Sequence, residues 1–406
     1  MNIALITIGN ELLAGFTVDT NASWIGRELS KAGGRLTWHQ TIGDERKDIL
    51  QALATIPTDC EIGIITGGLG PTHDDITADT LYEFSGDTPV FDQKYWNDIK
   101  YRLSLRNIDI PELNKNQAMR PQKGESIDNP IGSARGLHFV VNEKHLFALP
   151  GVPREMRTMM KSSILPFIRE NSNKELFVRT VRTTGIMESA LAEKLSEILN
   201  SIPHSIRIAF LPQFIGVDVR MSGYNEKDVN KLTKRIQLCA GKYIYGFDDE
   251  KLEETVGNML EEKKLTIATA ESCTGGLIGH RITGVSGSSS YYVGGIISYS
   301  NDVKEQTLNV DHSTLEKFGA VSGETAIQMA ENVRQVLKSN LGLSVTGIAG
   351  PTGGTKEKPV GLVYIALADG SHTQVKEFHF INDRGLNKHA SSQAALNMVR
   401  LYLMSR

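Results

Sequence analysis

The 406-residue chain has few cysteines, no long apolar run and no excess of charge of either sign. Its three cysteines are scattered without a CxxC pair, which argues against a disulfide framework and a zinc site. No apolar run approaches the roughly 20 residues that span a membrane, and the opening MNIALITIGNELL lacks the basic flank and long apolar core of a signal peptide. A formal net charge of -3 gives no electrostatic reason to expect nucleic acid. We therefore expect a soluble, cytoplasmic protein whose partners are neither membranes nor nucleic acids.

A chain of this length is too long for one ordinary domain. We expect three, over residues 1–171, 172–249 and 250–406. In the first, apolar runs at 2–8 and 61–66 and a further expected strand at 36–41 alternate with expected helices at 21–32 and 48–55. This alternation predicts an α/β domain, in which ligands bind at the carboxyl ends of the strands. A helical insertion is expected over 82–110.

The loop at 67–77, GGLGPTHDDIT, follows the apolar run at 61–66. Its glycines leave backbone amides open to a phosphate, its proline stiffens the turn, and its first threonine can donate to a phosphate oxygen. Its aspartates suit a divalent cation that bridges phosphates. A Gly-Pro turn before an acidic helix start is the alternative, but paired aspartates after a buried strand favour a phosphate site. The residues concerned are Gly67, Gly68, Gly70, Pro71, Thr72, Asp74, Asp75 and Asp79.

Together with TIGNELLAG, NPIGSARG and LPGVPREM, this loop resembles the molybdopterin-binding fold at the front of the CinA family. That fold binds pterin in molybdenum-cofactor enzymes. In CinA-type chains the resemblance implies hydrolysis of ADP-ribose to AMP and ribose 5-phosphate with a divalent cation (Mg, Co or Ni), with K⁺ as a further candidate. The motifs leave the choice between the two open. The resemblance adds Gly9, Asn10, Gly132, Ser133, Pro150 and Gly151 to the substrate-binding residues, and Glu11 and Asp44 to Asp74 and Asp75 as metal ligands.

The middle segment, about 172–248, reads as a small α+β domain with strands near 206–210 and 217–222 and a helix over 225–241. Its charges are balanced, so we expect a spacer or dimerisation module in place of a nucleic-acid binder. An acidic linker at 248–250 leads into the next region.

In the last region a buried strand over 265–270 runs into AESCTGG and then a helix from 277, which predicts a second α/β domain. Ser272 would lie near the helix N-terminus, where amides favour a developing oxyanion. A serine that cleaves an amide needs a base, and Lys304, close after the strand end at Tyr299, is the candidate. Arg384 suits a phosphate or carboxylate. Each residue taken singly has an ordinary structural explanation, and Cys273 is the rival nucleophile.

The segments AESCTGG, ISYSNDVK, VTGIAGP and the DR before the closing helix resemble the C-terminal domain of the CinA family, a nicotinamide-nucleotide amidohydrolase. The resemblance implies deamidation of nicotinamide mononucleotide (NMN) to nicotinic acid mononucleotide and ammonia without a cofactor, in a homodimer. It makes Ser272 the nucleophile, with Tyr299 and Lys304 as proton-transfer partners. The implied substrate-binding residues are Thr274, Gly275, Gly276, Thr346, Gly347, Gly350 and Arg384.

One departure stands out. Lys388 occupies a position where the family commonly has a second arginine, and a lysine keeps the charge but loses the bidentate fork. The alternative to an enzyme is a non-catalytic pterin- or nucleotide-binding protein with a competence-related regulatory role.

Overall fold

The computed structural model describes residues 1–105, 107, 111–172 and 176–406, so part of the expected insertion at 82–110 and the start of the expected middle segment lie outside the described residues. The chain divides into two compact units, Met1–Val178 and Arg179–Arg406, and each is considered by itself. Both are mixtures of helices and strands, which confirms the predicted α/β class. No helix of the described chain is long and apolar enough to cross a membrane.

The first unit is built on a six-stranded sheet of order β2-β1-β3-β8-β7-β6. Four neighbouring strands are parallel: β1 (Asn2–Ile8), β2 (Arg35–Ile42), β3 (Ile62–Thr66) and β8 (Lys144–Leu149). The other two, β7 (Gly136–Val141) and β6 (Glu125–Ile127), are antiparallel. The apolar runs formed parallel strands because both faces of this sheet are covered by helices.

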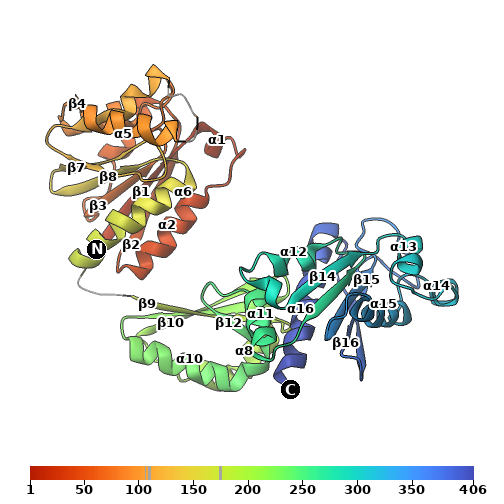
Figure 1. The fold of residues 1–406 in the computed structure, drawn as a ribbon. Helices are drawn as coiled ribbons and strands as arrows, with labels where there is room; N and C mark the ends of the chain where they lie inside the picture. The colour runs from red at the N-terminus through yellow and green to blue at the C-terminus, as the bar shows by residue number, and fades with distance from the viewer. Residues whose placement is uncertain (106, 108–110, 173–175) are drawn as a thin grey trace. The chain divides into compact units, whose positions relative to one another are not determined.

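One face packs on α2 (Thr20–Lys31), α6 (Pro153–Met159) and α7 (Leu165–Asn171), and the other on α3 (Arg46–Ala54) and α4 (Thr77–Ser85) (Figure 1). A short α1 (Asn10–Leu13) follows β1, and α5 (Gln93–Ser104) lies in the expected insertion. That insertion is not wholly helical, because β4 (Pro89–Phe91) pairs with β5 (Met119–Pro121) beside it.

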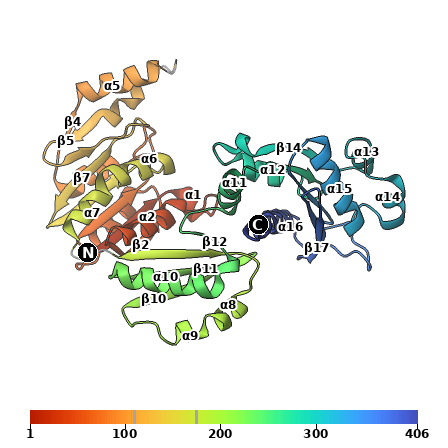
Figure 2. The same ribbon diagram turned by 60° about the horizontal axis from the view of Figure 1, so that its bottom comes forward.

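In the second unit, the middle segment has a four-stranded sheet of order β10-β11-β9-β12, with α10 (Glu226–Ala240) packed against it (Figure 2). Its strands are β9 (Phe177–Thr183), β10 (Ile206–Gln213), β11 (Gly216–Gly223) and β12 (Ile244–Phe247), and its short helices are α8 (Glu188–Lys194) and α9 (Ser196–Leu199). The predicted small α+β arrangement is confirmed.

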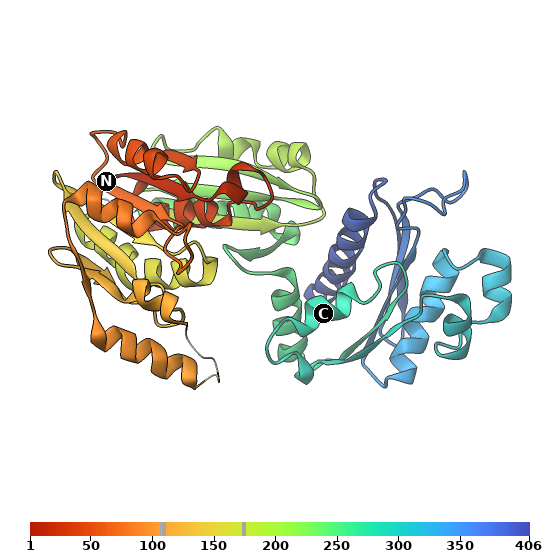
Figure 3. The ribbon, with the colours of Figure 1, turned by 90° about the horizontal axis from the view of Figure 1, so that it is seen from above.

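The last segment has a five-stranded sheet of order β14-β13-β15-β16-β17, in which β13, β14 and β15 are parallel. The strands are β13 (Ile267–Glu271), β14 (Tyr292–Ile297), β15 (Leu341–Gly347), β16 (Leu362–Ala368) and β17 (Thr373–His379). Helices α11 (Leu252–Glu262), α12 (Leu277–Thr283) and α16 (Arg384–Met404) cover one face, and α14 (His312–Phe318) and α15 (Gly323–Val336) the other (Figure 3). The short α13 (Asn301–Gln306) follows β14.

Helix α16 joins the middle and last segments into one unit. Arg400 is 2% exposed, and its guanidinium donates to the backbone oxygens of Lys242 and Ile244 at 2.7 and 2.8 Å. Charge-assisted hydrogen bonds of this kind are among the stronger ones in proteins. Helix α16 is therefore part of both cores.

Candidate active site

Three parallel strands end at one edge of the second unit's sheet, and each leads into residues singled out by the sequence. Strand β13 leads into Ser272, β14 into Tyr299, and β15 into the loop at 347–354. Strand β13 lies between the other two, so the strand that follows it in the chain, β14, is on one side and β15 is on the other. Such a switch point at the carboxyl ends is where open α/β sheets bind ligands.

Ser272 and Lys304 meet at this edge, although they are 32 positions apart in the chain. Lys304 Nζ donates to Ser272 Oγ at 3.2 Å and to the backbone oxygen of Ser298 at 2.7 Å. Lys304 is 1% exposed and Ser272 8%. Burial lowers the pKa of the Lys304 ammonium to about 8, since a charge is poorly solvated there. A lysine that loses its proton near neutral pH can serve as a base for the serine hydroxyl.

Cys273, the rival nucleophile, is buried in the hydrophobic core. Burial raises the pKa of its thiol to about 12. Because the thiolate is the nucleophilic form, a thiol that stays protonated at neutral pH is a poor candidate.

The turn after Ser272 uses most of its own polar groups. The Ser272 amide donates to the Val345 oxygen, and the Gly276 amide donates to the Glu271 carboxylate, so the latter is not open to a substrate. A Cβ on Gly276 would lie 2.9 Å from Ile297 Cδ1, and its φ of 91° also requires glycine. The amides of Cys273 and Thr274 have no oxygen acceptor in the described chain. Both amides lie beside the Cys273 sulfur, which is only a weak acceptor, so they remain available for a stronger one.

Three polar side chains gather beside the turn. The Arg384 guanidinium donates to the Tyr299 hydroxyl and to the Gly350 oxygen, both at 3.0 Å. A Cβ on Gly275 would lie 3.6 Å from Lys388 Nζ, so that ammonium lies over the turn. Tyr299 is 64% exposed, and within the described residues it forms no hydrogen bond to Ser272 or Lys304.

The loop after β15 contributes less than the sequence suggests. The Thr346 hydroxyl donates to the Ala320 oxygen at 2.6 Å, and Gly347 pairs with Val363 in the sheet. The backbone oxygen of Gly350 serves Arg384. These residues hold the loop and Arg384 in place, and Thr346 has no free hydrogen to give a substrate.

A comparable edge exists in the first unit. Gly9 and Asn10 follow β1, Asp44 follows β2, and the loop at 67–77 follows β3. Pro150 and Gly151 follow β8 and lie close to Gly67, whose Cα would be 3.5 Å from a Cβ on Gly151. The Asn10 amide donates to the Asp44 carboxylate at 2.8 Å. The glycine loops therefore meet at one place.

The carboxylates of this edge are held by their own loops. Asp75 accepts hydrogen bonds from the amide and hydroxyl of Thr72, and Glu11 folds back over Gly9. Asp74 is exposed. No three His, Cys, Asp or Glu side chains of the described residues lie close enough together to hold a metal ion. Glu11, Asp44, Asp74 and Asp75 therefore form no ready-made cluster of three metal ligands among the described residues.

Three polar contacts at this edge, made by two asparagine side chains, were missed by the sequence reasoning. Asn129 donates to the Glu155 carboxylate at 2.6 Å and accepts from the Gly132 amide at 2.9 Å, which fixes the loop that carries Gly132 and Ser133. Asn21 donates to the Gly151 oxygen at 2.8 Å. An asparagine at the start of a loop with proline and glycine, such as Asn129, is a sequence signal for a turn of this kind. No such signal in the sequence around Asn21 predicts its contact with Gly151.

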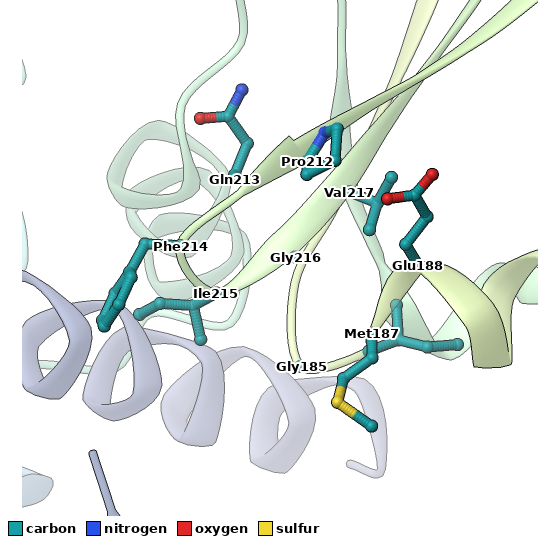
Figure 4. Close-up of a pocket in the computed structure, with 10 residues that line it drawn as sticks. Gly185, Met187, Glu188, Pro212, Gln213, Phe214, Ile215, Gly216 and Val217 are labelled. Carbon is teal, nitrogen blue, oxygen red and sulfur yellow. The ribbon is translucent and has the colours of Figure 1, made fainter. Parts of the chain in front are cut away.

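A separate cavity of about 320 Å³ lies in the middle segment, between the loop from Gly185 to Glu188 and the tip of the β10–β11 hairpin (Figure 4). Apolar side chains such as Met187, Phe214 and Ile215 line it. Glu188 is the one charged side chain among its lining residues, so the cavity has no pair of nucleophile and base.

Comparison with known proteins decides the family. A "CinA-like protein" of Salinibacter ruber is 41% identical over 407 residues, which cover 98% of this chain and 99% of the relative. The chain belongs to the CinA family. A "putative competence-damage inducible protein" of Halothermothrix orenii is 38% identical over 405 residues, which cover 98% of this chain and 98% of the relative.

Three family models match successive parts of this CinA chain. They are described as "probable molybdopterin binding domain" (4–170), "damage-inducible protein CinA KH domain" (178–246) and "CinA C-terminal domain" (249–403). Among solved structures, the competence/damage inducible protein CihA from Agrobacterium tumefaciens is 39% identical, with 37% of this chain and 93% of that one covered at a TM-score of 0.37. The CinA structure from Thermoplasma acidophilum is 32% identical, with 41% and 97% covered at a TM-score of 0.38. The relatives and the three family models confirm the family and the predicted domain types.

Proposed function

We propose that the second unit is a serine amidohydrolase that converts NMN and water to nicotinic acid mononucleotide and ammonia. The contact between the buried Lys304 ammonium and the Ser272 hydroxyl carries this proposal. Burying a lysine costs stability because its charge is poorly solvated, and the lowered pKa that results lets the neutral amine act as a base toward the serine.

In the first step, neutral Lys304 takes the hydroxyl proton while Ser272 Oγ attacks the carboxamide carbon. The carbonyl oxygen becomes an oxyanion, and the amides of Cys273 and Thr274 are the donors left for it. The amide that follows a nucleophile serves the same purpose in other serine hydrolases. The backbone oxygen of Ser298 keeps the Lys304 amine directed at the serine.

In the second step, the Lys304 ammonium gives its proton to the amide nitrogen, the C–N bond breaks and ammonia leaves. Water then attacks the ester between Ser272 and the nicotinoyl group, with Lys304 again taking a proton. The ester breaks, Ser272 regains its hydrogen, and nicotinic acid mononucleotide departs. One water is consumed, and one ammonia is released per NMN.

The cations beside the turn support a phosphate-bearing substrate. Arg384 and Lys388 are four residues apart on α16, so they lie on the same face at the helix N-terminus. Anions are favoured there by free amides and by the helix dipole. Tyr299 holds the Arg384 guanidinium in place, and we assign it this orienting role.

The test is ammonia release from NMN by the full-length protein and by Ser272→Ala. We expect turnover in the wild type and a loss of about 10³-fold or more in the variant, the scale seen when a catalytic nucleophile is removed. Binding of NMN without ammonia release by folded wild-type protein would favour the non-catalytic alternative. Equal turnover in both proteins would remove Ser272 from the mechanism.

For the first unit we propose binding of a phosphate-bearing nucleotide such as ADP-ribose at the edge formed by Gly9, the loop at 67–77 and Gly151. Converging glycine loops at the carboxyl ends of parallel strands support it. Because the carboxylates there do not form a metal cluster, we derive no step for pyrophosphate cleavage. Calorimetric titration with ADP-ribose, with and without Mg²⁺, measures the binding and its dependence on a metal.

A further inference from the structure

Glu271 is a buried carboxylate immediately before the nucleophile. It is 2% exposed and ends strand β13. A carboxylate is costly to bury unless its oxygens are hydrogen-bonded. We therefore expect hydrogen-bond donors at both oxygens of the Glu271 side chain.

Both oxygens of Glu271 accept hydrogen bonds from the start of α12. Oε2 accepts from the amides of Gly276 and Ile278 at 3.0 and 3.1 Å, and Oε1 accepts from the amide of Gly279 at 2.8 Å. These amides lack partners within the helix because they belong to its first turn. The carboxylate thus ties the far end of the nucleophile turn back to the strand before it.

The backbone of Glu271 reaches the other half of the catalytic pair. Its oxygen accepts from the Ser298 amide at 2.8 Å, and the Ser298 oxygen in turn accepts from Lys304 Nζ. One residue therefore fixes both the turn that carries Ser272 and the strand end that directs Lys304.

We propose that Glu271 is a positioning residue for this serine chemistry. Its carboxylate occupies the helix-end amides and holds the turn so that the amides of Cys273 and Thr274 stay free for the oxyanion. This inference rests on Ser272 being the nucleophile of the proposed function. Without the carboxylate, the Gly276, Ile278 and Gly279 amides would lack an acceptor, and the turn would relax toward another one.

The test compares full-length variants in two measurements. The first is covalent labelling of Ser272 by a fluorophosphonate, in which a serine O–P bond forms, fluoride leaves and the hydroxyl proton passes to Lys304. The second is ammonia release from NMN. Glu271→Gln keeps the size of the side chain but replaces one acceptor oxygen by an NH₂ donor that opposes a backbone amide. Glu253→Gln is the matched control, because Glu253 is also a largely buried carboxylate that pairs with α12, through Arg281 at the other end of that helix.

We expect Glu271→Gln to label about 100-fold more slowly than Glu253→Gln, the range found when an oxyanion donor is lost. We also expect its kcat for NMN to fall about 100-fold, with KM changed less than about threefold, because the oxyanion exists only in the transition state. A purely structural role would lower the unfolding midpoints of both variants without this split.

Equal labelling rates of the folded Glu271→Gln and Glu253→Gln variants would overturn the inference. If Glu271→Gln does not fold, Glu271→Asp decides, since its carboxylate is one methylene too short for all three amides. About tenfold slower labelling then supports the inference, and labelling at the wild-type rate overturns it. Labelling without ammonia release would reject NMN as the substrate and leave the Glu271 comparison valid. No labelling of the folded wild type would remove the reactive serine and with it the inference.

Discussion

The two units bring glycine loops to the same place in a similar layered architecture, but they treat the polar side chains there differently. In the first unit Asp75 is satisfied by Thr72, and Asp44 by the Asn10 amide. In the second unit a lysine is buried beside a serine, and two amides of the turn have no oxygen acceptor among the residues that the structure describes. Among the described residues, the edge of the second unit thus holds a lysine of lowered pKa against a serine, whereas the carboxylates at the edge of the first unit are hydrogen-bonded within their own loops. The location of a site and its chemistry are separate properties of a fold.

The largest effect is expected from the buried lysine. Lys304→Met should lower ammonia release from NMN about 10³-fold or more, because the serine loses its base. Adding Ser272→Ala should cost little more, since members of a catalytic unit are not additive.

The first unit offers the control. Lys144 also donates its Nζ to two backbone oxygens, those of Pro57 and Cys60, and within the described residues it has no hydrogen bond to a serine. Lys144→Met should leave ammonia release within about twofold. An equal loss in both variants would contradict the contrast between the units.

The pH dependence should follow the Lys304 ammonium. With its pKa lowered to about 8, kcat/KM should rise about 100-fold between pH 6 and pH 9 and then level, because only the neutral amine accepts a proton. The unfolded chain still holds this proton up to about pH 10.5, so this group makes the free energy of unfolding rise with pH between about 8 and 10.5. A kcat/KM for NMN that does not change between pH 6 and pH 9 would exclude Lys304 as the base.

Substrate binding should depend on Arg384. Arg384→Ala removes a cation and the partner of Tyr299, so KM for NMN should rise about 10- to 100-fold with a smaller change in kcat. Steady-state kinetics separates the two constants. A Tyr299→Phe variant, which keeps the ring, should show the same kind of change at smaller size; a fall in kcat alone would instead indicate that Tyr299 transfers a proton.

The first unit should respond independently. Asp75→Asn weakens the acceptor of the Thr72 amide and hydroxyl, and the loosened loop should bind ADP-ribose about tenfold more weakly in calorimetry. Ammonia release should stay within about twofold. A parallel loss of amidase activity would show that the units do not work separately.

The smallest effect is expected at Lys388, which occupies the position where the family commonly has an arginine. Lys388→Arg restores a bidentate fork next to the Gly275 turn. KM for NMN should fall about two- to fivefold with kcat unchanged. A higher KM would show that the pocket has adapted to the ammonium.

The elements of this structure that could be predicted are those marked by a local sequence pattern. The parallel strands β1, β3, β13 and β15 follow from apolar runs, because both faces of each sheet are covered. Strand β17, whose residues are intermediate or exposed, lies at an edge and has no such run. It was missed for that reason.

The candidate site was less accessible to sequence reasoning. The Ser272–Lys304 pair could be suggested through the resemblance, but the burial that lowers the lysine pKa comes from packing. The contact between Tyr299 and Arg384 joins residues 85 positions apart, so no local pattern contains it. Glu271 reads as an ordinary polar strand end until its three amide donors are seen.

The shared helix α16 limits where this chain can be divided. It begins at Arg384 and later buries Arg400 against oxygens of the middle segment. A shortened gene that starts after residue 249 would encode the five-stranded sheet of the last segment. The Arg400 guanidinium would then lack its two acceptors, and the apolar residues that pack against Tyr245 would be exposed. Recombination that separates these segments would therefore need a compensating change at position 400.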